Sequence, residues 1–396
     1  MSMHPAGRWA AALVAATLLA APAAAVRAAD PYEINAILPL TGNIAFVGQT
    51  EQQALKALEG YVNQTGGIRG RPLSFVVADD QSDVKTSLQL AQGLIAKNVP
   101  VILGPSSPQA CAAIAPIIAQ SGPVLYCQAN AGQATPGGYE FFAAFPYEPQ
   151  FAVTFRYFRA RGLRRIAYIV STDAGGQDVE RAIATTSALP ENKDVQIVAR
   201  EHFSPGDITV AAQMARIKAA TPDVLVAWST GGSGGTLLRG ARDAGLDLPT
   251  VTSTGNLSAN FFKQYQSLFP TNLYFAAVAY YAGDAVGTPA SKAAVASLTS
   301  ALATVGAKPD MISISIWDPA LLLVDALRKL GPDVPAEKLR EYLAGLRGWV
   351  GANGAYDFRA IPQRGLGENN VVMVRYTGTN PGVAVSAFGG APLPGK

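Results

Sequence analysis

Residues 99–127 read VPVILGPSSPQACAAIAPIIAQSGPVLYC. The apolar run 99–103 predicts a buried strand, residues 109–121 predict a helix, and residues 124–127 predict a second strand. In a parallel strand–helix–strand unit the helix begins beside the carboxyl ends of the strands, which brings Cys111 near Cys127. A disulfide and a pair of small buried hydrophobic residues both fit this placement.

The same alternation of strand and helix extends along the chain on both sides of this unit. Before it, we expect strands at 34–38 and 73–78 and helices at 51–63 and 86–95. After a strand at 141–145, a second series begins. Its helices are 151–160, 179–189, 211–219 and 236–244, and its strands are 166–170, 195–201, 224–228 and 250–253. Alternation at this spacing predicts an α/β fold with two doubly wound parallel-sheet lobes.

The last third of the chain breaks the alternation. Residues 293–302, 314–330 and 336–346 read as consecutive helices, followed by strands at 355–358 and 371–376. Helices without new strands between them indicate that the chain returns to complete an earlier lobe. The Gly/Pro-rich end from residue 378 is expected to be irregular.

The N-terminus has the layout of a secretory signal peptide. Arg8 precedes an Ala/Leu-rich run and a small-residue stretch, and cleavage is expected after Ala28. A membrane anchor is the alternative, but the run is shorter than the ~20 apolar residues that a spanning helix needs. The expected location is therefore the periplasm, where disulfides form.

Size and charge limit the possible partners. The 396 residues exceed what one hydrophobic core usually supports, so two domains are expected. The chain has 31 basic and 28 acidic side chains, and two of the basic ones, Arg8 and Arg27, leave with the signal. This near-neutral balance argues against nucleic acid or an anionic membrane as the main partner.

Short polar residues follow the predicted strands, and these residues are the candidates for contact with a ligand. They occupy residues 104–108 (GPSSP), 128–132 (QANAG), 171–176 (STDAGG), 229–233 (STGGS) and 252–256 (TSTGN). Two open sheets that face each other enclose a ligand outside the carboxyl ends of their strands. Hydroxyls and helix N-terminal amides suit a carboxylate or another hydrogen-bonding group, although the same residues also cap helices and make turns.

Catalytic and cofactor sites find little support. The stretch 231–235 (GGSGG) has the form of a nucleophile elbow, but His202 is the only histidine outside the signal and precedes that serine in the chain. One histidine and two cysteines exclude a rich zinc cluster. Glycine-rich phosphate-binding loops are absent, so we expect no enzyme activity, metal or cofactor.

A set of motifs in order resembles the type I periplasmic solute-binding proteins of the branched-chain amino acid (leucine/isoleucine/valine-binding) ABC transporter family. The resemblance spans nearly the whole mature chain, and no single motif is specific alone. The motifs are 37–42 (ILPLTG), 47–48 (VG), 64–73 (QTGGIRGRPL), 78–83 (ADDQSD), 101–106 (VILGPS), 238–246 (LRGARDAGL) and 351–358 (GANGAYDF).

The resemblance implies a hinged trap with three crossovers, near Pro146, Ala277 and Gly351. Residues 29–146 and 278–350 would form lobe 1, residues 147–277 and 351–380 would form lobe 2, and residues 381–396 would be an irregular tail. The ligand would bridge the lobes and stabilise a closed form, which docks as a monomer on the permease of an ABC importer. A soluble sensor of the same fold is the alternative role.

The resemblance also places the ligand, which we expect against residues of both lobes. In lobe 1 these are Ser106, Ser107, Pro108, Ala129, Asn130 and Ala131, and in lobe 2 they are Gly175, Thr230 and Thr254. Aromatic candidates for the cleft or hinge are Phe46, Tyr147, Trp317, Tyr280 and Tyr281, each of which also suits core packing.

The chain departs from the family pattern at Thr254. Amino-acid binders place an acid there to pair with the ligand ammonium, and residues 252–256 contain no acid. Val47 likewise stands where leucine binders have an aromatic residue, with Phe46 beside it. A buried ammonium without a counter-charge is unfavourable. We therefore favour an organic or aromatic acid or an amide, and keep an aliphatic amino acid paired with Asp173 or Asp318 as the alternative.

Overall fold

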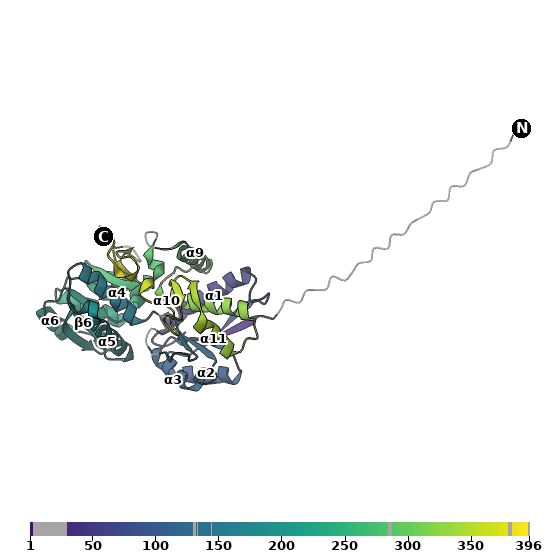
Figure 1. The fold of residues 1–396 in the computed structure, drawn as a ribbon, viewed down its shortest axis with the longest axis horizontal. Coiled ribbons are helices and arrows are strands. Elements are labelled where there is room, and N and C mark those ends of the chain that lie inside the picture. Colours follow the sequence, from purple (N-terminus) through teal and green to yellow (C-terminus); the bar gives the residue numbers. More distant parts are fainter. Residues whose placement is uncertain are drawn as a thin grey trace.

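The protein has two α/β lobes that lie side by side (Figure 1). The computed structural model describes residues 1–2, 30–129, 132, 134–143, 145–283, 287–378 and 382–394. The expected signal cleavage after Ala28 lies outside the described residues. No helix among those residues is long and apolar enough to span a membrane.

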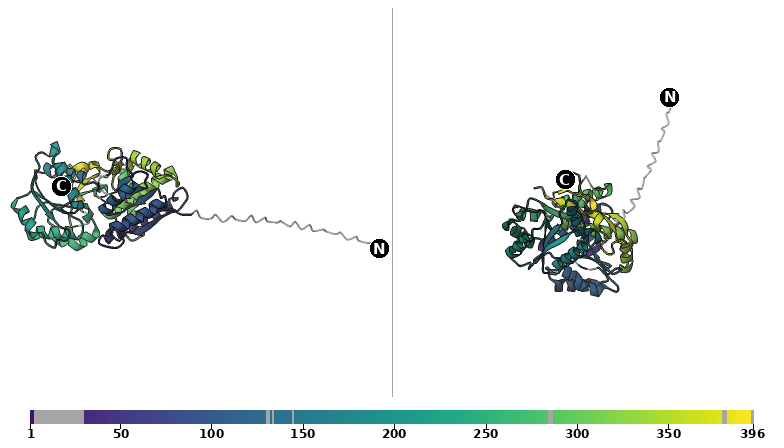
Figure 2. Two further views of the ribbon diagram at one scale, coloured as in Figure 1. Left: turned by 90° about the horizontal axis from the view of Figure 1, so that it is seen from below. Right: turned by 60° about the vertical axis from the view of Figure 1, so that its left-hand side comes forward.

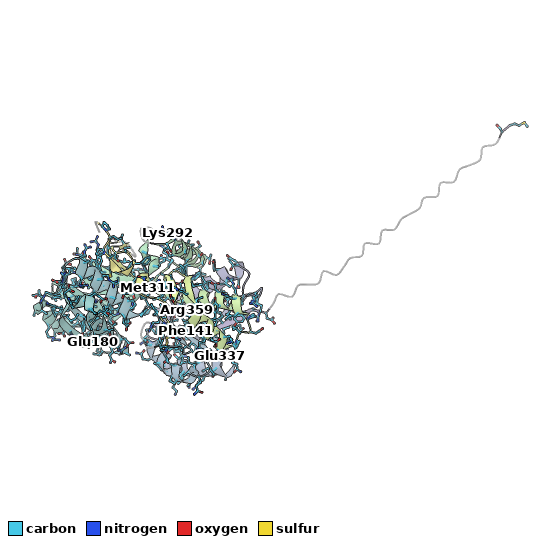
Figure 3. The ribbon with its side chains drawn as sticks, viewed as in Figure 1. Phe141, Glu180, Lys292, Met311, Glu337 and Arg359 are labelled. Atoms are coloured by element: carbon cyan, nitrogen blue, oxygen red, sulfur yellow. A yellow bond between two sulfur atoms is a disulfide. The ribbon has the colours of Figure 1, made fainter. Side chains whose placement is uncertain are left out.

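Lobe 1 is built on a five-stranded parallel sheet with the strand order β2-β1-β3-β4-β5. Its strands are β1 (Tyr32–Leu38), β2 (Leu73–Asp79), β3 (Val101–Leu103), β4 (Val124–Cys127) and β5 (Glu140–Phe142). Its first helices are α1 (Ala45–Gln64), α2 (Val84–Ala96) and α3 (Pro108–Ile118). Phe141 of β5, labelled in Figure 3, is fully buried, and its ring contacts those of Tyr126 and Phe358.

Lobe 2 is built on a seven-stranded sheet with the order β14-β13-β10-β9-β8-β6-β7, in which β13 spans Val372–Arg375 and β14 spans Val383–Ala384. The parallel strands are β6 (Arg165–Ser171), β7 (Gln196–Phe203), β8 (Val224–Trp228), β9 (Thr250–Thr252) and β10 (Leu273–Ala277). Its helices are α4 (Tyr147–Ala160), α5 (Ala174–Ser187), α6 (Ala211–Ala219), α7 (Gly232–Asp243) and α8 (Ala259–Tyr265). Two α/β lobes built on mainly parallel sheets confirm the predicted fold class, although β13 and β14 pair antiparallel at one edge of the larger sheet.

The late helices pack against lobe 1. They are α9 (Pro289–Thr304), α10 (Met311–Leu330) and α11 (Ala336–Gly345). Both α9 and α10 pack along α1, where the rings of Tyr61 and Trp317 lie 5.9 Å apart. In Figure 2 the yellow-green helices α10 and α11 lie in the same lobe as the purple and blue first part of the chain.

The chain passes between the lobes after β5, after β10 and after β12. The third passage was expected near Gly351. There the chain forms β11 (Arg347–Val350), which pairs with β12 (Ala355–Asp357), and the Gln363 carbonyl still accepts from the Phe142 amide of lobe 1. After this third passage the chain rejoins the larger sheet at β13 (Val372–Arg375).

The C-terminal segment differs from the expected irregular tail. β14 (Val383–Ala384) pairs with β13, and the turn Phe388–Gly390 receives a hydrogen bond from Arg156 at the Gly389 carbonyl. Glycine and proline dominate this segment and leave no periodic pattern, so its order depends on tertiary contacts with lobe 2.

Candidate ligand-binding site

The carboxyl ends of the strands in the two lobes face each other. The Gly132 amide of lobe 1 donates to Asp178 Oδ2 on α5 of lobe 2 at 2.9 Å. A β-carbon on Gly231 of lobe 2 would lie 3.9 Å from Cζ of Phe46 in lobe 1. We call residues 104–107 and 128–129 the lobe 1 edge, and residues 229–231 and 253–256 the lobe 2 edge.

Ser106 on the lobe 1 edge is held by a buried carboxyl group. Its hydroxyl oxygen lies 2.5 Å from Glu51 Oε2, so the two groups share a hydrogen bond. Glu51 lies in the second turn of α1 and is 1% exposed. That helix approaches β1 closely at Gly48, where a β-carbon would lie 2.3 Å from the Pro39 carbonyl oxygen. Burial raises the pKa of Glu51 to about 8, and the neighbouring charge of Asp80 adds to the rise.

Other predicted residues of lobe 1 surround the start of α3. Ser107 is the N-cap of α3 and accepts from the Ala110 amide, while Pro108 is the first residue of the helix. Ala129 is buried after β4. Asn130 and Ala131 lie outside the described residues.

A disulfide joins Cys111 in the first turn of α3 to Cys127 at the end of β4, with the two Cα atoms 6.1 Å apart. It therefore fastens the start of the helix to the strand end beneath the lobe 1 edge. Next to it lies a hollow of about 190 Å³. Its lining is mainly apolar and comprises Pro108, Cys111, Ala112, Ala115, Pro116, Gly132, Glu140 and Phe142.

The lobe 2 edge is joined by uncharged groups. The Thr230 and Ser253 hydroxyls lie 2.8 Å apart, which connects the loops after β8 and β9. The fully buried Asn256 connects the same loops, since it accepts from the Gly231 amide at 2.9 Å and donates to the Ser229 carbonyl at 2.8 Å. Gly231 has a φ of +70°, a conformation that favours glycine.

Thr254 is buried and points toward the first passage between the lobes. Its hydroxyl donates to Gln150 Oε1 at 3.4 Å, and Gln150 in turn donates to the carbonyls of Phe145 and Pro146. In the described part of the chain, no carboxylate is hydrogen-bonded to Thr254. Gly175 is the second residue of α5, beside Asp173, which caps that helix by accepting from the Gly176 amide.

The predicted aromatic residues separate into one exposed ring and several buried ones. Phe46 is 42% exposed and lies across from Gly231. Tyr147 is buried, with its ring edge-on to Trp228 at 5.7 Å. Trp317 is 1% exposed in the core, so it packs α10 against α1 and does not line the edges.

Tyr281 of the pair Tyr280–Tyr281 is also buried, and its hydroxyl donates to the Leu257 carbonyl. Asp318 was the other acid considered as a partner for a ligand ammonium group, but its carboxylate already accepts hydrogen bonds from the backbone. It accepts from the amides of Ala352 at 2.9 Å and Asn353 at 2.6 Å, and burial raises its pKa to about 6.

Sequence reasoning included Asn256 only as part of the loop 252–256, and it missed three residues that organise this site: Glu51, Asp178 and Arg364. Arg364 donates to the Gly132 carbonyl at 2.8 Å and lies 4.3 Å from the centre of the Phe142 ring, so it fixes the segment that contacts Asp178. Glu51 had one available signal, because it is an acid at a helix position aligned with Ala54, Leu55 and Leu58 on the buried face.

Comparison with known proteins agrees with this architecture. The profile of a family described as periplasmic binding protein matches residues 31–380. The Leu/Ile/Val-binding protein BraC3 of Rhizobium johnstonii is 23% identical over 324 residues, which are 81% of this chain and 86% of that protein. The leucine-, isoleucine-, valine-, threonine- and alanine-binding protein of Pseudomonas aeruginosa is 26% identical over 240 residues, 59% of this chain and 63% of its own.

Solved structures share the fold at low identity. The branched-chain amino acid transporter substrate-binding protein LivJ of Streptococcus pneumoniae, in complex with isoleucine, has a TM-score of 0.72 at 18% identity, covering 90% of this chain and 98% of its own. A solute-binding protein of an ABC transporter from Rhodopseudomonas palustris, in complex with 4-hydroxybenzoate, also has a TM-score of 0.72, at 17% identity, covering 90% and 95%. The match to the family profile over residues 31–380 shows that this chain belongs to the periplasmic binding protein family.

Proposed function

We propose that this protein captures a small organic acid that lacks an amino group, such as an aromatic carboxylate, between its two lobes, and delivers it to the permease of an ABC importer. The choice of this ligand class rests mainly on the environment of Thr254. This residue contacts the neutral amide of Gln150 at the position where amino-acid binders place an acid. An ammonium group buried there would lack a counter-charge.

The chemistry of the two edges supports a carboxylate. Ser106 on lobe 1 and Thr230 on lobe 2 offer hydroxyl groups, which donate well to anions. The Phe46 ring and the mainly apolar hollow beside Pro108 offer surfaces for an apolar or aromatic body. The solute-binding protein of R. palustris solved with 4-hydroxybenzoate has the same fold, which supports this choice of ligand class.

Thermal unfolding of the mature protein tests the ligand class. We expect benzoate or 4-hydroxybenzoate to raise the melting temperature, since a ligand at 100 times its Kd adds about 2.7 kcal/mol to the free energy of unfolding. Leucine, isoleucine and valine should leave it unchanged. A shift with the amino acids alone would overturn the proposal.

A substitution at Thr254 tests the reason for this choice. Thr254→Glu supplies a carboxylate where the ammonium would lie, and Thr254→Gln supplies a side chain of the same size without charge. We expect the glutamate variant to gain isoleucine binding and to lose benzoate binding, while the glutamine variant gains no isoleucine binding. Equal behaviour of the two variants would show that charge at this position does not select the ligand.

An aliphatic amino acid is the second candidate, favoured by the printed names of the Rhizobium and Pseudomonas relatives. Asp173 is the exposed acid at the start of α5 that would then meet the ammonium. Asp173→Asn should abolish amino-acid binding under this alternative, and should leave benzoate binding intact under the main proposal.

The proposal also covers the location, processing and oligomeric state of the protein. The protein would act in the periplasm as a monomer after loss of residues 1–28, without a cofactor and without catalysing a reaction. Mass spectrometry of the periplasmic protein tests the cleavage, and light scattering tests the monomer. Loss of benzoate uptake in cells that lack the gene would support transport, whereas a purely sensory role would leave uptake unchanged.

A further inference from the structure

Glu51 is a buried acid directly behind a residue that we expect to contact the ligand. It is 1% exposed, and its Oε2 lies 2.5 Å from the Ser106 hydroxyl oxygen. Ser106 itself is partly exposed on the lobe 1 edge. A group placed this way can change how Ser106 presents its hydrogen to a ligand without touching the ligand.

Glu51 lies near another acid and has no cationic partner among the described residues. Asp80, which is also 1% exposed, acts on it electrostatically, and Asp80 accepts hydrogen bonds from the Ser82 amide and the Ser87 hydroxyl. An isolated ionised carboxylate is strongly disfavoured in such a buried position, and a second acid nearby disfavours it further.

The charged residues on the elements that pack around α1 do not supply a cation that would stabilise the ionised form of Glu51. Arg328 reaches the carbonyls of Val62 and Gly67 at the far end of α1, and Asp318 binds the amides of Ala352 and Asn353. On β1, β2 with its following loop, α9 and α10, the charged residues are Glu33, Asp79, Asp80, Asp83, Lys292, Asp318, Asp325, Arg328 and Lys329.

We infer that Glu51 is a positioning residue. Its carboxyl group stays protonated and donates a hydrogen bond to Ser106 Oγ, which leaves the Ser106 hydroxyl hydrogen free to bind an anionic ligand group. This inference rests on the proposed function for the nature of the ligand. When Glu51 is ionised, Ser106 donates to Glu51 instead, and a negative charge lies one hydrogen bond away from the ligand. Both changes weaken the binding of a carboxylate.

The arrangement makes anion binding depend on pH with a defined sign. With the pKa of Glu51 raised to about 8, the group is protonated at neutral pH in the free protein. Above that pH the protein must take up a proton to bind the anion. The dissociation constant should therefore rise about tenfold between pH 6 and pH 9, since at pH 9 about one molecule in ten is protonated.

Calorimetric titration with benzoate at pH 6 and pH 9 tests the inference, because the benzoate carboxylate stays ionised over this range. We expect the tenfold rise in the wild-type protein and an unchanged dissociation constant in Glu51→Gln, whose amide donates to Ser106 and carries no charge. Asp80→Asn removes the neighbouring charge and leaves the burial of Glu51, so it should keep a pH dependence whose midpoint lies at lower pH. A pH-independent wild type, or the same dependence in Glu51→Gln, would overturn the inference while the proposed function stands.

A measurement without ligand distinguishes failure of the inference about Glu51 from failure of the proposed function. The infrared difference between the wild-type protein and Glu51→Gln should contain a carboxylic acid C=O band at pH 6 that disappears as the pH rises through about 8. Absence of that band at pH 6 would overturn the inference even if benzoate binds. Presence of the band without stabilisation by any acid would leave Glu51 protonated and overturn the proposed function.

Discussion

The two facing edges are held in different ways. The lobe 1 edge is fastened by the Cys111–Cys127 disulfide and by a hydrogen bond to the buried Glu51. The lobe 2 edge is joined by neutral hydrogen bonds, from Asn256 and between Thr230 and Ser253. We therefore expect the stability of the lobe 1 edge to depend on pH and on reductant, and that of the lobe 2 edge to depend on neither.

The largest effect is expected from Asn256→Ala on the lobe 2 edge. The change leaves the Gly231 amide and the Ser229 carbonyl without partners, and we expect a loss of about 4 kcal/mol in the free energy of unfolding, measured with urea. Asn256→Asp keeps the acceptor for Gly231 and should lose less. An alanine variant as stable as the wild type would show that this edge does not depend on Asn256.

Removal of the disulfide should affect lobe 1 nearly as much. We expect the double variant Cys111→Ala, Cys127→Ala to lose about 3 kcal/mol, because the bridge closes a short loop in the unfolded chain. Dithiothreitol should lower the melting temperature of the wild type and leave that of the double variant unchanged. An insensitive wild type would contradict the assigned role of the bridge.

The pH dependence of stability should distinguish the wild type from Glu51→Gln. Burial raises the pKa of Glu51 from 4.5 to about 8, so the folded state binds more protons than the unfolded state in that window. The wild type should therefore lose about 2 kcal/mol relative to the variant between pH 6 and pH 8. Asp318 and Glu140, with pKa values raised to about 6 and about 7, contribute equally to both proteins. Parallel stability curves would be evidence against a proton on Glu51.

The smallest effect concerns the contact between the lobes. Asp178→Ala removes the acceptor of the Gly132 amide and should weaken benzoate binding about fivefold, or about 1 kcal/mol, through faster dissociation. Arg181→Ala removes the exposed ion pair that Asp178 also makes and should leave the affinity unchanged. Equal affinities of the wild type and Asp178→Ala would show that this contact does not favour the ligand-bound form.

Sequence periodicity predicted the fold because parallel strands and covering helices are local patterns. It placed residues 124–127 and 211–219 where β4 and α6 lie. It missed the first six residues of α1, which contain polar residues and Gly48, the point where the helix lies close to Pro39. It left Trp317 open between cleft and core, since an aromatic residue on an amphipathic helix suits both.

The site was predictable only as a set of loops. The carboxyl ends of the strands located Ser106, Thr230 and Thr254, because sheet geometry brings such ends together. The partners that orient them come from distant parts of the chain, as when Glu51 reaches Ser106 across 55 positions and Gln150 meets Thr254 across 104. Such pairings depend on tertiary packing and leave no local pattern.

Hydrogen–deuterium exchange with and without 4-hydroxybenzoate tests most directly whether the ligand binds between the lobes. We predict slower exchange at both edges, in peptides that cover residues 104–107 and residues 229–231 with 253–256. Protection confined to one lobe, or to the hollow of about 390 Å³ lined by Lys329, Tyr342 and Arg359 on lobe 1, would contradict capture between the lobes.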